Sequence, residues 1–118
     1  MRTRKPRLAG FTLVEIMIIV AIIGLLAALA IPNYVKARTT SQKNTCISNL
    51  RQIDGAVQQW ALEYRKDPAA TVAYADISDY MRNNVVCPSG GTTFDNSYTL
   101  ADVQTQPVCQ KQITHKLP

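Results

Sequence analysis

The feature that most constrains this chain is an apolar run from Phe11 to Ile31, in which Glu15 is the only charged residue. These 21 residues would form a helix roughly 31 Å long, which matches a bilayer hydrocarbon core of about 30 Å. After Pro32, charged or amide side chains interrupt the sequence every few residues. We therefore expect one membrane-spanning helix, followed by a segment exposed to water.

The length of the chain limits what can follow the apolar run. A short leader and the run leave fewer than 90 of the 118 residues for a folded domain. That length is near the small end for an independent hydrophobic core. We expect one small domain.

The net charge of +5 belongs mainly to the leader, which carries four of the 13 basic residues: Arg2, Arg4, Lys5 and Arg7. Without them the balance is nine basic against eight acidic residues. A strongly basic surface is what nucleic-acid binding requires. We therefore expect no nucleic-acid partner.

The same four charges predict the orientation in the membrane, because segments rich in Lys and Arg stay cytoplasmic. Only Lys36 and Arg38 lie close to the run on its other side. We expect a single-pass protein of the inner, cytoplasmic membrane whose residues from Asn33 onward are exported. Disulfides form and persist in that compartment.

A cleaved secretory signal is the first alternative, because the basic leader and apolar stretch are followed by Ala28-Leu29-Ala30. Cleavage after Ala30 would yield a small secreted protein. Glu15 at the head of the apolar stretch is unusual for a signal, and Pro32 close to the cut makes a poor substrate. The run is better explained as a retained helix.

The six residues "GFTLVE", Gly10 to Glu15, join the basic leader to the apolar run. They resemble the cleavage and methylation motif of the type IV prepilin family, which includes type II secretion pseudopilins. The resemblance implies that a prepilin peptidase cuts after Gly10, that Phe11 is N-methylated, and that the chain is a filament subunit. It also implies as partners an inner-membrane assembly platform, other copies of the chain, and membrane lipid before assembly. The final location would be a periplasmic or cell-surface filament.

Glu15 needs a reason to lie at membrane depth. The helix macrodipole favours a carboxylate near the helix start by about 0.3 to 1 kcal/mol, but an unpaired charge in the bilayer costs several times more. Cleavage after Gly10 would create an α-amine on Phe11, and the resemblance implies that this amine, on a neighbouring subunit, pairs with Glu15. The alternative is an unpaired carboxylate that reaches the membrane edge.

Beyond the run, an apolar stripe predicts that the helix continues to Lys66. The stripe repeats at helical spacing and consists of Cys46, Leu50, Ile53, Val57, Trp60 and Tyr64. Asp54-Gly55 could be a turn, but the stripe keeps its phase, so one helix is preferred. Pro32 falls where the family has a helix-kinking proline, and we expect a kink or a locally melted turn there. Asp67-Pro68 would end the helix.

The remaining residues predict a small α+β head. Asp76 could cap a short helix over Ile77–Arg82, and Cys87 to Gly91 have the composition of a turn. Two strands are expected, over Thr93–Leu100 and Val103–Gln110. The predicted organisation is a leader (1–10), a transmembrane helix that becomes the filament core (11–31), an amphipathic stem (32–66) and a globular head (67–118), a pilin-like lollipop.

Three cysteines allow three single pairings or a metal site. Cys87, Cys109 and His115 lack the short Cys-x-x-Cys spacing typical of zinc sites, so no metal is expected. A Cys87–Cys109 disulfide would close the turn and hairpin and contribute roughly 3 kcal/mol, and Cys46 would then be a buried thiol. The pieces "CPSGG" and "PVC" resemble those of short pilin-like proteins, which further favours this pairing.

Catalysis is not expected, because no Ser or Cys can be placed beside a base and His115 is the only histidine. We expect no cofactor. The aspartate-proline-tryptophan-glycine pattern of calcium-binding major pseudopilins is missing. The sequence therefore favours a structural subunit of a type IV pilus-like or type II secretion filament. The second alternative is a single-pass, membrane-anchored binding domain outside the cytoplasm.

Overall fold

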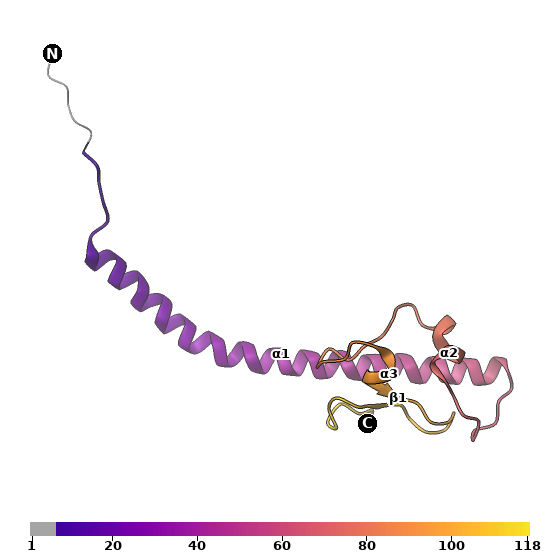
Figure 1. Ribbon diagram of the computed structural model, residues 1–118. Coiled ribbons are helices and arrows are strands. Elements are labelled where there is room, and N and C mark those ends of the chain that lie inside the picture. The colour runs from indigo at the N-terminus through magenta and orange to yellow at the C-terminus, as the bar shows by residue number, and fades with distance from the viewer. Residues whose placement is uncertain (1–6) are drawn as a thin grey trace, which may run out of the picture. The chain divides into compact units, whose positions relative to one another are not determined.

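The computed structural model describes residues 7–118, so the leader residues Arg2, Arg4 and Lys5 lie outside the described part of the chain. The chain separates into two compact units, one ending at residue 37 and the other covering residues 38–118. Helix α1, Leu13–Glu63, contributes its first half to one unit and its second half to the other. Figure 1 shows this helix and the short elements that follow it.

The first half of α1 carries the apolar run and is helical without a break through Pro32. The locally melted turn, one of two expected outcomes, is therefore not formed, and the kink stays a prediction. Proline cannot donate a backbone hydrogen bond inside a helix. The side-chain Nδ2 of Asn33 donates to the carbonyl oxygen of Leu29 at 3.1 Å and so adds a donor to this turn.

The second half of α1 supplies the core of unit 38–118. The predicted stripe is confirmed from Cys46 to Trp60, and α1 is one helix across Gly55. Tyr64 lies beyond the helix end and is exposed, while the small residues Ala56 and Ala61 widen the buried face. Against this face pack Val72, Ile77, Met81, Val85, Phe94, Tyr98 and Val103.

Helix α1 ends three residues earlier than predicted, because Arg65 adopts a left-handed conformation with φ of 49°. The N–H of Lys66 donates to the Ala61 carbonyl at 2.9 Å, and the N–H of Arg65 donates to Leu62 at 3.4 Å. These two bonds form a Schellman motif, which usually places glycine at the left-handed position. The ammonium group of Lys66 lies 5.4 Å from the centre of the Trp60 ring.

The connection after α1 leads into two short helical segments. These are α2, Tyr74–Ile77, and the 3₁₀ helix η1, Ser78–Tyr80, where the sequence predicted one helix over Ile77–Arg82. Asp76 does act at the helix start, because its Oδ2 accepts the N–H of Ala73 at 2.9 Å. The prediction placed Asp76 before the first residue of the helix. Asp76 is instead the third residue of α2 and bonds back to Ala73, so the helix begins earlier than predicted.

The predicted hairpin is shorter than expected. Strands β1, Tyr98–Thr99, and β2, Val108–Cys109, pair antiparallel, with Tyr98 opposite Cys109. The predicted strand over Thr93–Leu100 is wrong in its first half, which forms helix α3, Phe94–Ser97. Side chains there bond to nearby backbone, as in Ser97 Oγ donating to the Thr93 carbonyl at 2.6 Å, and such bonds compete with strand pairing.

The predicted second strand, Val103–Gln110, also pairs differently at its start. Val103 donates its N–H to the Ala70 carbonyl at 3.2 Å, and Thr71 and Asp102 form an isolated antiparallel bridge. The segment after α1 thus takes part in backbone pairing instead of running free as a connection. The outcome is an α+β unit with a small two-stranded sheet, as predicted in class.

Candidate functional site

Two places in the chain carry features beyond ordinary core packing, one in each unit. The first is the start of α1. Thr12 donates its backbone N–H to Oε2 of Glu15 at 2.8 Å, and Glu15 donates its N–H to Oγ1 of Thr12 at 3.2 Å. This reciprocal pair is a capping box, which satisfies two backbone donors at the helix start. Sequence reasoning missed this local role of Glu15, although Thr followed three residues later by Glu is its signature.

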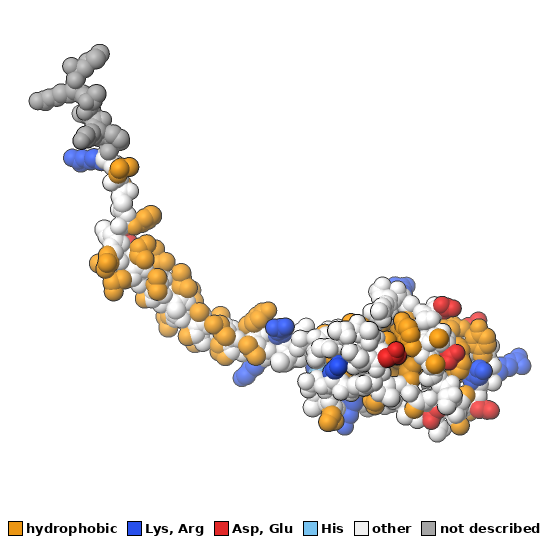
Figure 2. All heavy atoms as spheres, viewed as in Figure 1, with side chains coloured by type: hydrophobic (Ala, Val, Ile, Leu, Met, Phe, Trp, Pro, Cys, Tyr) orange, Lys and Arg blue, Asp and Glu red, His pale blue; other side chains and the backbone are white. Residues whose placement is uncertain are grey.

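The apolar residues that follow lie open on the surface of this unit. Their large side chains range from 47% exposed at Ile16 to 66% at Leu25. Figure 2 shows the continuous hydrophobic covering of this part of α1. By length and composition, α1 is the one helix in residues 7–118 that could cross a membrane. An exposed apolar surface of this size requires lipid or other protein to cover it.

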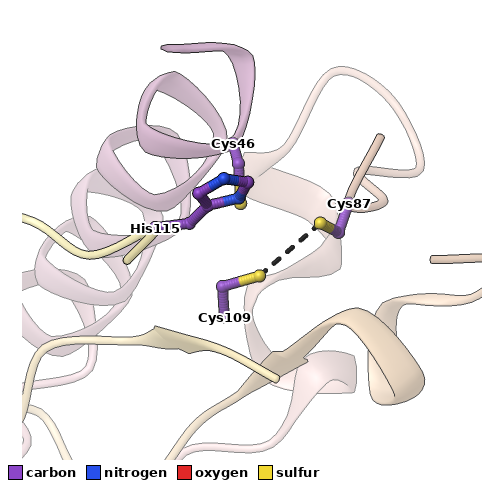
Figure 3. Close-up of side chains that lie close together, drawn as sticks. All are labelled: Cys46, Cys87, Cys109 and His115. Atoms are coloured by element: carbon purple, nitrogen blue, oxygen red, sulfur yellow. Dashed lines mark hydrogen bonds between the residues drawn. The ribbon is translucent and has the colours of Figure 1, made fainter. Parts of the chain in front are cut away.

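The second place is a cluster of four buried side chains in unit 38–118: Cys46, Cys87, Cys109 and His115. One potential metal-binding atom from each residue lies within 4.8 Å of the other three. The sulfurs of Cys87 and Cys109 are 3.5 Å apart. Figure 3 shows these two sulfurs facing each other and the His115 ring beside Cys46. The predicted disulfide between Cys87 and Cys109 stays a prediction.

Each member of the cluster comes from a different segment. Cys46 lies on the buried face of α1, and Cys109 lies in β2. Cys87 opens the turn through Gly91, whose N–H donates to the Cys87 carbonyl at 2.8 Å. His115 follows β2 near the end of the described chain. The backbone of this turn passes close to Gly91, since a Cβ on Gly91 would lie 2.7 Å from the Cys87 nitrogen.

Tyr98 and Asn49 form the polar surroundings of Cys46. The Cys46 sulfur lies 3.7 Å from the Tyr98 hydroxyl, to which Asn49 Nδ2 also donates at 3.0 Å. The same Nδ2 donates to the Val86 carbonyl at 3.1 Å, next to Cys87. One amide group on α1 therefore bonds both the residue that contacts Cys46 and the residue that precedes Cys87.

The electrostatics of the cluster differ from residue to residue. Burial raises the pKa of the Cys46 thiol to about 12. Burial also acts on Cys109, but the backbone N–H groups of Gln112 and Lys111 hold the pKa of that thiol below its ordinary value. Burial and the nearby Lys43 charge lower the pKa of His115, so its imidazole is neutral at pH 7.

The spacing of the four residues gave no signal for this cluster. Zinc motifs are recognised by short ligand spacings, whereas here Cys87 and Cys109 are 22 residues apart. One sequence signal was available. Cys46 lies on the same helix face as the predicted core, so the head had to pack against it.

The N-terminal segment also matches known proteins. Residues 6–31 match the family model described as the prokaryotic N-terminal methylation motif. The chain is 32% identical to the competence protein ComGC of Bacillus subtilis over 83 residues, which are 69% of this chain and 82% of that protein. It is 31% identical to the type II secretion system core protein G of Klebsiella pneumoniae over 91 residues, which cover 72% of this chain and 63% of that protein.

A third relative matches over a shorter stretch. The type IV major pilin protein PilA of Myxococcus xanthus is 52% identical over 49 residues, which are 42% of this chain and 22% of that pilin. For two further pilus proteins, the chain spans about half of the relative's length, 52% and 55%. No solved structure matches the chain significantly.

Proposed function

The chain belongs to the family of type IV pilins and pseudopilins, which are structural proteins and not enzymes, and on that premise we propose that it is a subunit of a pilus-like or secretion filament. The observation that carries the proposal is the register of three features. "GFTLVE" stands directly before the apolar run, α1 begins within it, and the run is exposed on every side. A helix of this kind suits lipid first and the core of a filament afterwards.

We propose that maturation removes residues 1–10. A prepilin peptidase would cut between Gly10 and Phe11, and the new Phe11 amine would be methylated. The structure is compatible with such a cut, because Gly10 and Phe11 precede α1 and are exposed. The head would lie outside the cytoplasm, and an inner-membrane assembly platform would draw subunits from the membrane into a periplasmic or cell-surface filament.

We propose that Glu15 has two roles at different stages. In the single chain it caps α1 through Thr12. In the filament its charge pairs with the Phe11 amine of a neighbouring copy, which provides a cation where an unpaired carboxylate is costly. The capping bonds leave this second role open, because a carboxylate has two oxygens and about four acceptor positions.

Intact mass spectrometry of the protein from membranes tests the proposed maturation. We expect one species that begins at Phe11 and carries one additional methyl group. A mature N-terminus at Ile31 would indicate the small secreted protein instead. An uncut chain that begins at Met1 would indicate the membrane-anchored binding domain. Either result would contradict the filament proposal.

A further inference from the structure

The cluster in unit 38–118 has the composition of a metal site. Three thiols and one imidazole meet in a buried position, and sulfur and nitrogen ligands of this kind are preferred by Zn²⁺. We propose that Cys46, Cys87, Cys109 and His115 bind a structural zinc ion. This inference rests on unit 38–118 alone and does not depend on the proposed filament function.

The distances fit a tetrahedral site. With Zn–S bonds of about 2.3 Å, two sulfurs on one tetrahedral ion are roughly 3.8 Å apart, and a sulfur and a nitrogen are slightly closer. The sulfurs of Cys87 and Cys109 are 3.5 Å apart, and all four potential ligand atoms lie within 4.8 Å of one another. A small inward movement of the widest pair would complete the coordination.

His115 supplies an independent observation. Its Nδ1 is buried and has no hydrogen-bond partner among residues 7–118. A buried polar atom without a partner costs about 1–3 kcal/mol. The imidazole is 6% exposed, so general solvation does not remove this cost. A metal ion in the cluster would give this nitrogen atom a partner.

The number of cysteines also favours a metal over a disulfide. A Cys87–Cys109 disulfide would use two members of the cluster and would leave Cys46 and His115 buried beside it without a covalent or metal partner. A zinc ion would use all four. Both arrangements engage the same sulfurs, so the zinc site and the predicted disulfide exclude each other in one molecule.

The proposed site is structural because its ligand set is closed. Four protein ligands complete a tetrahedral zinc ion, whereas catalytic zinc keeps one position open. The ion would join α1, the turn that Cys87 opens, strand β2 and the final segment, which lie far apart in the sequence. Domains this small commonly need a metal or disulfides to supplement the core. His115 also lines a surface cleft with Lys43 and Thr40, which would give the ion access.

Metal content of the full chain, purified in detergent without chelator, tests the proposal. We expect about one zinc per chain. After zinc is exchanged for Co²⁺, we expect the absorption of tetrahedral cobalt together with thiolate-to-cobalt charge transfer. Iron in place of zinc, or octahedral cobalt spectra, would overturn the assignment. So would a reduced protein that takes up no zinc when the ion is added.

Single variants test the ligand set. Cys46→Ser and His115→Gln each remove a ligand and should lower the zinc affinity by at least about tenfold, which is the smallest loss expected for a residue that only orients a zinc ligand. His115→Cys should retain zinc and shift the cobalt charge-transfer band, because a fourth sulfur replaces nitrogen. Thr114→Ala, next to His115, is the matched control and should bind like the wild type. Unchanged zinc affinity in Cys46→Ser would overturn the proposal.

Peptide mapping without reductant distinguishes the two uses of the sulfurs. Protein taken from its native membranes should show three cysteines that react with alkylating reagent only after zinc is removed. A Cys87–Cys109 disulfide with Cys46 free would overturn the zinc site and confirm the predicted pairing. If Cys46→Ser fails to fold, as judged from Trp60 fluorescence, the zinc content and cobalt spectrum of the wild type still decide the question.

Discussion

The hydroxyl of Tyr98 lies 3.0 Å from Nδ2 of Asn49, and this hydrogen bond ties strand β1 to helix α1. The Tyr98 ring is 2% exposed and lies against Phe94, with ring centres 5.7 Å apart. Burial is the largest of the effects that raise the pKa of Tyr98 well above its ordinary value, so the hydroxyl stays protonated. The hydrogen bond holds strand β1 against the part of α1 that carries Cys46.

Replacing Tyr98 with Phe tests this contact. We expect the free energy of unfolding to fall by about 1 kcal/mol, because the hydrogen bond from Asn49 and the longer contact with the Cys46 sulfur are lost, while Asn49 keeps its bond to Val86. Denaturant unfolding of the full chain in detergent, followed by fluorescence of Trp60, measures the change. Tyr74→Phe is the control, since the Tyr74 hydroxyl has no hydrogen-bond partner within the described residues. Equal effects of the two variants would contradict the assigned role.

The two proposed roles of Glu15 can be separated by three variants. Glu15→Gln removes the charge but keeps an acceptor for the Thr12 N–H, as glutamine does in capping boxes. Thr12→Ala removes the side chain that completes the box and keeps the charge. Glu15→Ala removes both the charge and the acceptor for the Thr12 N–H. We expect Glu15→Gln and Glu15→Ala to abolish filaments, and Thr12→Ala to retain them, with cleavage after Gly10 unchanged in all three.

Filament yield after shearing, electron microscopy and an immunoblot of total membranes measure these outcomes. The expected phenotype of the Glu15 variants is a processed monomer that stays in the membrane. Wild-type filament yield from Glu15→Gln would show that helix capping is the main role of this carboxylate. Loss of the protein from membranes would instead assign Glu15 to insertion or stability.

Gly91 should tolerate no side chain. A Cβ there would lie 2.7 Å from the nitrogen and 2.9 Å from the carbonyl oxygen of Cys87, and still closer to Ser97. Because backbone atoms yield little, we expect Gly91→Ala to reduce stability by about 1–3 kcal/mol. Gly55→Ala is the matched control. Gly55 lies inside α1 with open space around it, so alanine should increase stability by up to about 1 kcal/mol. Thermal unfolding followed by circular dichroism compares the two.

Tyr80 gives a prediction for alkaline pH. Its hydroxyl donates to the carboxylate of Glu63, and this bond raises the pKa of Tyr80 to about 12. The ordinary value is about 10, so the contribution of this bond to stability is complete below pH of about 10 and is lost as the pH rises through 12. Ultraviolet titration of tyrosinate should show a step near pH 12 that disappears in Tyr80→Phe.

Glu63→Gln provides the control for this titration. It should move the Tyr80 step down toward pH of about 10, because glutamine carries no charge that disfavours tyrosinate. An unchanged step near pH 12 in Glu63→Gln would show that the carboxylate is not the cause of the shift.

Most of α1 could be predicted from the sequence, because residues three and four positions apart share one face of a helix and local spacing therefore shows which face is buried. The spacing from Cys46 to Trp60 identified the buried face of the helix, and the motif from Gly10 to Glu15 identified the family. The helix end was misplaced because Arg65 adopts a conformation that residues other than glycine rarely take. The two predicted strands do pair, but they are shorter than predicted, and the start of the second one bonds to the segment after α1. Alternating side chains do not specify where pairing stops or which segment a strand will meet.

The sequence by itself determined the exposed apolar helix with its capped start, because both follow from residues within a few positions of one another. Only the tertiary structure brought Cys46, Cys87, Cys109 and His115 to one point. That meeting depends on a turn held tight at Gly91, on the register that places Cys109 opposite Tyr98, and on the path of the final segment. Contacts between distant segments are set by the packing of the whole unit, and local spacing carries no record of them.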